Sequence, residues 1–262
     1  MLKKRVLSGL VGVALALLII YEGGIVYFLT IFIITLLGLE EYGRLSVGRK
    51  FYFPRYLSFA AAGVYLLLLY YEVPNILEAA PLFLFLPFSL YILFNKDYSF
   101  RDLMFTAWGV IYIVWFFSFL IVLRNLPDGL NHTLLLFWSI WISDTAAFFI
   151  GSSLGKHKLI PRISPNKSVE GALGGLLGTM LFVFLFRGFV NMEPVTAILA
   201  GGLISLLGQV GDLMESALKR YLKVKDSGAL IPGHGGVLDR FDSVIFAAPF
   251  LYFYLIFLTE VL

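Results

Sequence analysis

The sequence of 262 residues contains no cysteine and few charged residues. Without cysteine the chain can form neither a disulfide framework nor a thiolate metal site. Charged residues make up 14% of the chain, whereas soluble domains usually carry about 25%. Hydrophobic residues reach 60%, and the mean hydropathy is +0.89. This composition excludes an ordinary soluble domain and predicts an integral membrane protein.

Apolar segments near the length needed to cross ~30 Å of hydrocarbon recur along the chain. Nine such segments lie at residues 6–21, 25–38, 56–71, 77–94, 103–123, 132–150, 169–187, 195–215 and 239–259. The fourth is the least regular because it contains Pro81 and Pro87. The predicted fold class is therefore an all-α polytopic integral membrane protein with about nine transmembrane helices.

The N-terminus has a second interpretation. Lys3, Lys4 and Arg5 followed by an apolar run also fit the start of a signal peptide. However, a tight turn at Glu22-Gly-Gly leads directly into another apolar run. This arrangement favours a helical hairpin, so we expect the first segment to be retained.

The distribution of basic residues predicts the orientation of the chain. If the N-terminus is cytoplasmic and nine spans alternate, 18 of the 20 Lys and Arg residues fall on the cytoplasmic side. Only Arg124 and Arg187 fall on the other side. Because loops rich in Lys and Arg stay in the cytoplasm, we expect a cytoplasmic N-terminus and an outside C-terminus. The predicted location is the cell inner (cytoplasmic) membrane, with multiple passes.

Six carboxylates lie within these segments or at their ends, all toward the expected cytoplasmic side. They are Asp144, Glu170, Asp212, Glu215, Asp239 and Asp242. Acidic residues inside a membrane are costly, so each is a candidate for function. The last four form two pairs spaced three residues apart, and such pairs share one face of a helix. Oxygen-lined faces of this kind suit a hard cation such as Mg²⁺. The alternative is simple charge pairing with Lys219, Arg220 and Arg240.

Basic residues and glycines gather near these carboxylates. Lys219, Arg220 and Lys225 precede His234, Gly235 and Gly236, while Lys167 precedes Glu170. Glycines let backbone N–H groups approach an anion, so the combination favours polyphosphate binding. Polybasic loops also set topology or contact anionic lipid headgroups, and this second explanation stays open. His234 alone carries little information.

The region around these residues resembles a known family. From Ser216 the sequence reads Ser-Ala-Leu-Lys-Arg-Tyr-Leu-Lys-Val-Lys-Asp-Ser-Gly-Ala-Leu-Ile-Pro-Gly-His-Gly-Gly-Val-Leu-Asp-Arg-Phe-Asp242. This stretch, called the signature segment (216–242) below, resembles the signature of phosphatidate cytidylyltransferases (CDP-diglyceride synthetases) without a missing element. Upstream, Ser143-Asp-Thr-Ala-Ala-Phe, Ser164-Pro-Asn-Lys-Ser-Val-Glu-Gly and Gly211-Asp-Leu-Met-Glu-Ser are also similar to the family. The resemblance covers roughly residues 140–245 in detail.

The resemblance implies that CTP and phosphatidic acid react to give CDP-diacylglycerol and pyrophosphate, with Mg²⁺ as cofactor and the number of cations left open. The implied catalytic residues are Asp144, Lys167, Glu170, Lys219, Arg220, His234 and Arg240. The implied nucleotide-binding residues are Lys219, Arg220, Lys225, Gly235 and Gly236. The implied metal ligands are Asp144, Asp212, Asp239 and Asp242. Residues 1–130 would then hold spans one to five. Residues 131–262 would hold the catalytic spans six to nine, with cytoplasmic loops at 151–168 and 219–238.

Two other functions compete with this one. A CTP-dependent lipid kinase of a related family would release CDP instead of pyrophosphate. A secondary transporter would show internal repeats and a site near the middle of the membrane, and neither is evident in this sequence. The expected partners are CTP, phosphatidic acid and membrane lipids. A homodimer is also expected, and no nucleic acid.

Overall fold

The computed structural model describes residues 2–224, 227–228 and 235–261. The chain forms two compact units, each built from two stretches of sequence. Unit 1 comprises Met1–Ile121 and Tyr221–Arg240, and unit 2 comprises Val122–Arg220 and Phe241–Leu262. The signature segment therefore contributes to both units.

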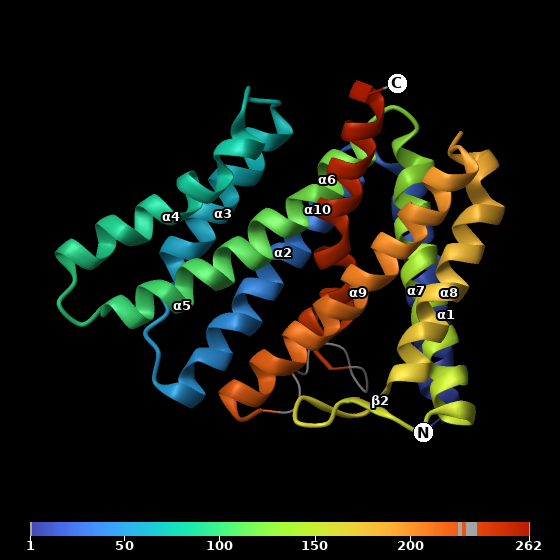
Figure 1. Cartoon of the computed structure of the whole chain (residues 1–262). Coiled ribbons are helices and arrows are strands. Elements are labelled where there is room, and N and C mark those ends of the chain that lie inside the picture. The colour runs from blue at the N-terminus through green and yellow to red at the C-terminus, as the bar shows by residue number, and fades with distance from the viewer. Residues whose placement is uncertain (1, 225–226, 229–234, 262) are drawn as a thin grey trace. The chain divides into compact units, whose positions relative to one another are not determined.

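Unit 1 consists mainly of apolar helices that follow one another along the chain. They are α1 (Leu2–Glu22), α2 (Gly24–Ser46), α3 (Arg55–Tyr70), α4 (Ile76–Phe94), α5 (Phe100–Val110), the π-helical turn η2 (Ile111–Trp115) and the start of α6 (Phe116–Asn125). A short 3-10 turn, η1 (Val47–Arg49), follows α2. Helix α3 packs against both α2 and α4, and α4 packs against α5 (Figure 1).

Specific contacts fix the start and the position of α5. The side chain of Ser99 accepts a hydrogen bond from the backbone N–H of Asp102, and the Asp102 carboxylate accepts one from the N–H of Ser99. This reciprocal capping box satisfies two N–H groups that the helix leaves unpaired. The Tyr42 hydroxyl donates to the carbonyl of Phe105 at 2.8 Å. Helix α5 is thereby tied to α2 inside unit 1.

Unit 2 contains the remaining helices and a small β-hairpin. Its elements are the rest of α6, α7 (Gly129–Leu154), β1 (Lys158–Ile160), β2 (Ser164–Ser168), α8 (Val169–Phe186), the 3-10 turn η3 (Arg187–Phe189), α9 (Pro194–Leu222) up to Arg220, and α10 (Leu238–Val261) from Phe241. Helices α7 and α8 lie side by side, and the antiparallel pair β1–β2 connects them (Figure 1). The Ser168 side chain then caps α8 by accepting the N–H of Gly171 at 3.1 Å.

Small residues allow the close contact between α7 and α8. A Cβ atom added at Gly175 would lie 2.9 Å from the carbonyl oxygen of Ser143, and one at Gly171 would lie 2.8 Å from that of Ala147. Side chains larger than hydrogen would therefore push the helices apart. Close approach through small residues is a common way for helices to associate in lipid.

The prediction of an α-helical polytopic membrane protein is confirmed. Among the described residues, seven helical segments are long and apolar enough to cross a membrane: Gly24–Ser46, Ile76–Phe94, Phe100–Asn125, Gly129–Leu154, Val169–Phe189, Pro194–Leu222 and Leu238–Phe257. Two shorter apolar helices lie at Val11–Glu22 and Arg55–Tyr70. Helix α4 is continuous despite Pro81 and Pro87. The total of nine spans and the orientation stay predictions, and the β1–β2 hairpin is an addition to the expected all-α fold.

Candidate active site

A cavity of about 550 Å³ lies in unit 2 where α7, β2, α8 and α9 meet. It receives Asp144 from α7, Lys167 from β2 and Asp212 from α9. Asn166, Ser168 and Gln209 add further polar groups to the lining, alongside Ala147, Phe148, Gly151, Ser152, Leu159, Gly171 and Ala172. Three residues predicted from the sequence as site residues therefore share one cavity.

The charged groups of this cavity are directly paired. The Lys167 ammonium forms an ion pair with the Asp212 carboxylate, and each side chain is 31% exposed. Lys167 also attracts the nearby Asp144 carboxylate. Ser216 is the first residue of the signature segment, and its hydroxyl donates to Asp212 at 3.4 Å. One lysine thus balances two carboxylates that would otherwise repel each other.

Asp242 of α10 joins this group because α9 and α10 approach closely beside it. A Cβ atom added at Gly211 would lie 2.5 Å from the carbonyl oxygen of Asp242, so glycine is required at this contact. The Asp242 carboxylate interacts electrostatically with Asp212, Asp144 and Lys219. Asp144, Asp212 and Asp242 are called the aspartate cluster below. Its negative charges are offset by Lys167 and Lys219.

A buried polar network joins the three helices that carry the cavity. The hydroxyls of Ser143 on α7 and Ser205 on α9 lie 2.8 Å apart. The Gln209 amide donates to Ser205 at 3.1 Å and to the carbonyl of Ala172 on α8 at 3.1 Å. Hydrogen bonds between membrane helices each contribute about 0.6 kcal/mol. Their main effect here is to fix α7, α8 and α9 next to Asp144 and Asp212.

The aspartate cluster has the right chemistry for Mg²⁺, although its side chains are not closed around one point. Among residues 2–224, 227–228 and 235–261, no three acidic or histidine side chains are close enough together to hold a metal ion. Mg²⁺ usually takes only one or two protein carboxylates and completes its shell with water and substrate phosphates. Asp144 and Asp212, which both line the cavity, therefore fit such an ion.

Two further carboxylates predicted to lie near the site have local partners. Glu170 accepts the backbone N–H of Lys156 at 3.1 Å, and its other oxygen lies 2.6 Å from Nδ1 of His157. It holds the turn between α7 and β1. Glu215 is 1% exposed and pairs with Lys219 at 2.6 Å, one helical turn away. The catalytic role expected for Glu170 stays a prediction.

The remaining basic residues are less closely grouped. Arg220 is exposed and its Nε donates to the carbonyl of Ile163 at 3.3 Å, which links α9 to the β-hairpin. Arg240 lies in the first turn of α10 and is exposed. It is the last residue of the second stretch of unit 1. Lys225 and His234 lie outside the described residues. The structure thus brings Lys167 and Lys219 to the aspartate cluster, while the roles of the other four stay predictions.

Asp239, Gly235 and Gly236 meet within unit 1. The Oδ2 atom of Asp239 accepts the N–H of Gly236 at 2.8 Å, the N–H of Ser227 at 3.0 Å and the Ser227 hydroxyl at 2.9 Å. Gly235 has φ +86°, a left-handed conformation that favours glycine. In this conformation the Gly236 N–H is directed to Asp239. The expected roles of these residues in nucleotide and metal binding stay predictions.

Sequence reasoning missed Glu41 and Gln209. Glu41 is buried in α2, with 2% exposure, and contacts the signature segment. The predicted second span ends at residue 38, three residues before Glu41, so this carboxylate is not counted among those inside a span. Gln209 was overlooked because it is uncharged. The available signal was its position one turn before Asp212 inside an apolar helix.

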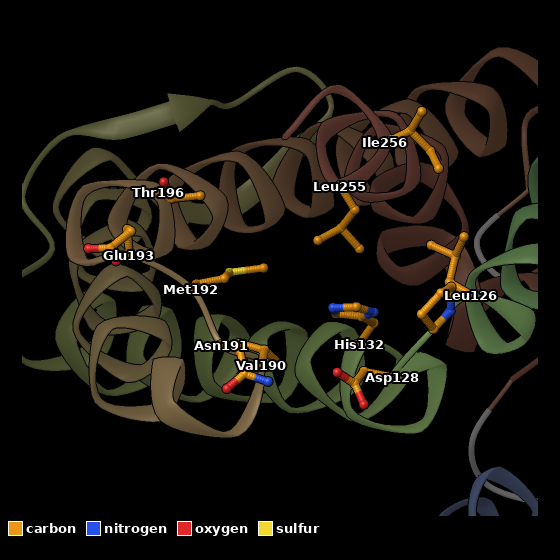
Figure 2. Close-up of a pocket in the computed structure, with 11 residues that line it drawn as sticks. Leu126, Asp128, His132, Val190, Asn191, Met192, Glu193, Thr196, Leu255 and Ile256 are labelled. Carbon is orange, nitrogen blue, oxygen red and sulfur yellow. The ribbon is translucent and has the colours of Figure 1, made fainter. Parts of the chain in front are cut away.

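A second cavity, of about 480 Å³, lies at the other end of α7 in unit 2. His132, Met192 and Leu255 project into it (Figure 2). Its charged lining residues are Asp128 and Glu193. Among the described residues two carboxylates line each cavity, but the first cavity also has Lys167 whereas no Lys or Arg lines the second. Of the two cavities, the one at the aspartate cluster is suited to an anionic substrate.

Over nearly its whole length the chain is similar to known proteins. The family model described as "Cytidylyltransferase family" matches residues 3–258. The phosphatidate cytidylyltransferase of Bacillus subtilis (strain 168) is 36% identical over 263 residues, covering 97% of both chains. Proteins of that name from Staphylococcus epidermidis and Staphylococcus aureus (strain COL) are 34% and 35% identical over 257 residues, covering 95% of this chain and 97% of theirs. This chain belongs to the cytidylyltransferase family.

Proposed function

We propose that this protein transfers the cytidylyl group of CTP to phosphatidic acid, giving CDP-diacylglycerol and pyrophosphate. The observation that carries the proposal is the meeting of Lys167 and Asp212 with Asp144 in one cavity of a cytidylyltransferase-family chain. The names of the relatives, which cover nearly the full length, support the choice of phosphatidic acid as acceptor.

The reaction joins two anions and needs charge neutralisation above all. A phosphate oxygen of phosphatidic acid attacks the α-phosphorus of CTP, a new P–O bond forms, and the bond to the β-phosphate oxygen breaks. Pyrophosphate leaves with that oxygen. Lys167 and Lys219 neutralise negative charge on the phosphates, and holding both reactants in line removes much of the entropic barrier. The phosphatidic acid phosphate is already ionised, so no general base is assigned.

One or two carboxylates of the aspartate cluster would hold Mg²⁺, and phosphate groups of CTP would supply further oxygen ligands. The ion would add positive charge where negative charge develops on the leaving pyrophosphate. Lys167 pairs with Asp212, and its side chain is long and flexible enough to turn toward a phosphate instead. The metal would then balance the carboxylates that Lys167 had neutralised.

The direct test is product analysis with purified protein in lipid nanodiscs. CTP labelled at the α-phosphate is incubated with phosphatidic acid and Mg²⁺, and lipid and aqueous products are separated. We expect the label in CDP-diacylglycerol and an equal amount of pyrophosphate in solution. Diacylglycerol replaces phosphatidic acid in the control. Release of CDP with phosphorylation of the control lipid would identify a CTP-dependent lipid kinase and refute the proposal.

We propose further that the chain spans the inner membrane nine times, with a cytoplasmic N-terminus. Seven long apolar helices and two shorter ones support this count. The same topology puts 18 of the 20 Lys and Arg residues in the cytoplasm. It also puts the aspartate cluster near the leaflet surface where cytoplasmic CTP meets a lipid phosphate. The homodimer expected from the family resemblance stays a prediction.

Because the chain has no cysteine, single cysteines can report its topology without a background. Ser153, exposed near the end of α7, and Asn191, exposed between α8 and α9, are suitable positions. In intact cells stripped of any outer barrier, we expect an impermeant thiol reagent to label Asn191→Cys and not Ser153→Cys. The opposite pattern would reverse the orientation.

A further inference from the structure

Glu41 is a buried carboxylate in unit 1 whose neighbours are residues of the signature segment. It lies on α2 within a span-length apolar helix, and its exposure is 2%. A carboxylate is costly to bury unless hydrogen bonds satisfy it. Glutamate at such a position in a membrane helix therefore requires specific partners.

The partners of Glu41 are the groups that begin α10. Its Oε1 accepts the backbone N–H of Val237 at 2.8 Å, and its Oε2 accepts that of Leu238 at 3.0 Å. Helix α10 starts at Leu238, and N–H groups at a helix start have no partner within the helix. The positive end of the helix dipole also favours a negative charge there. Glu41 therefore caps α10 from a helix nearly 200 residues away in sequence.

Two glycines of the signature segment lie directly against this carboxylate. A Cβ atom at Gly228 would lie 2.6 Å from Glu41 Oε1, and one at Gly236 would lie 2.5 Å from Oε2. Both distances are shorter than non-bonded atoms tolerate, so a side chain at either position would displace the Glu41 carboxylate or the main chain beside it. The two glycines let the main chain pass directly over Glu41.

Ser227 connects Glu41 to Asp239. Its hydroxyl lies 3.2 Å from Glu41 Oε2 and 2.9 Å from Asp239 Oδ2. A hydroxyl has one proton, so it donates to one carboxylate at a time. Asp239 also accepts the N–H groups of Ser227 and Gly236. Glu41, Ser227 and Asp239 consequently form one network, called the loop anchor below.

We propose that Glu41 is a positioning residue for cytidylyl transfer: it fixes residues 227–228 and 235–239 and thereby sets the position of Asp239. This role rests on the proposed function, because only then does the signature segment have a substrate to meet. Glu41 itself makes no contact with substrate in this account. Its carboxylate acts through the backbone groups that it holds.

The matched variants are Glu41→Gln and Glu40→Gln. The amide of Glu41→Gln retains one acceptor oxygen but turns an NH₂ group toward an N–H of the signature segment, so at least one donor loses its partner. Glu40 is the adjacent residue, with a 13% exposed side chain, and pairs with Arg44 at 2.9 Å and Arg55 at 2.7 Å. Its substitution changes charge equally without touching the loop anchor.

Two measurements on the full chain in nanodiscs separate the anchor from its effect on catalysis. Hydrogen–deuterium exchange of peptides covering 235–242 reports whether the backbone N–H groups of Val237 and Leu238 stay hydrogen-bonded. Since a hydrogen bond to a charged group contributes about 1.5–3 kcal/mol, we expect exchange at least ~10-fold faster in Glu41→Gln. We expect kcat for CDP-diacylglycerol formation to fall by a similar factor. Glu40→Gln should stay within about twofold of wild type in both measurements.

Each outcome has a definite consequence. Unchanged exchange in Glu41→Gln would overturn the anchor whatever the activity. If Glu41→Gln exchanges faster but its kcat equals that of Glu40→Gln, the positioning role is wrong. If the wild type makes no CDP-diacylglycerol, the proposed function fails, and the exchange data still decide whether Glu41 holds these residues. Ser227→Ala removes one of the three donors to Glu41 and should show the same effects to a smaller degree, which keeps the test decisive if Glu41→Gln does not fold.

Discussion

The aspartate cluster of unit 2 and the loop anchor of unit 1 both place carboxylates in apolar helices, but different groups neutralise them. Lysine side chains balance Asp144, Asp212 and Asp242. Backbone N–H groups and one hydroxyl satisfy Glu41. Lysine has a flexible stem and can change partner, whereas a backbone N–H cannot leave without moving the chain. The first arrangement suits exchange of a cation or phosphate, and the second suits permanent positioning.

The largest effect is expected from Asp212→Asn. The variant keeps the volume of the side chain but removes the charge that Lys167 and a cation share. Activity should fall at least ~100-fold, the scale of losing one electrostatic contact to the transition state. CDP-diacylglycerol formation is measured against Mg²⁺ concentration. The control is Asp128→Asn at the second cavity, which should retain wild-type turnover. Full activity of Asp212→Asn at saturating Mg²⁺ would show that the aspartate cluster has a structural role. The aspartate cluster and the loop anchor would then not differ in function.

A smaller effect is expected from Gly236→Ala in the loop anchor. The added Cβ would lie 2.2 Å from Ser227 Oγ and 2.5 Å from Glu41 Oε2. Overpacking of this kind costs about 1–3 kcal/mol, so we expect about a 10-fold loss of activity and a lower melting temperature. Gly188→Ala is the control, because nothing lies within 4 Å of its added Cβ. Equal melting temperatures for the two variants would show that the loop anchor is not rigid.

The smallest effect is expected from Glu170→Gln. Glu170 resembles the loop anchor because it accepts N–H groups of Lys156 and His157, but it lies at an exposed turn. Solvent screens such pairs strongly, so activity should fall no more than about fivefold. The measurement is kcat in the same assay. A loss of 100-fold or more would instead group Glu170 with the aspartate cluster as a catalytic residue.

The helices were largely predictable from the sequence because long apolar runs leave few alternatives in a membrane. A helix lies at each of the nine predicted positions. The rarity of acidic residues in such runs made Asp144 and Asp212 candidate site residues, and the family resemblance implied that they belong to one site. Helix α4 tolerates Pro81 and Pro87, consistent with the greater tolerance of proline in membrane helices.

The remaining features depend on tertiary contacts that no local pattern records. The β1–β2 hairpin has strands of three and five residues with many polar side chains, so it shows no alternating hydrophobic pattern. The π-helical turn Ile111–Trp115 has an ordinary apolar sequence. Glu41 escaped notice because its partners follow 186 to 197 residues later. Only the folded chain shows that a polar residue near a span end has a buried partner.

The long separation between Glu41 and its partners has a consequence for biosynthesis. Val237 follows Glu41 by 196 residues, and ribosomes add about 5–20 residues per second, so roughly 10–40 s pass before Val237 is made. During this interval α2 is already available for insertion, while its carboxylate lacks the groups that satisfy it in the finished protein. The nascent chain must keep Glu41 in contact with water at the membrane surface until the signature segment is made. Final seating of α2 is therefore a late event in assembly, completed near the end of translation.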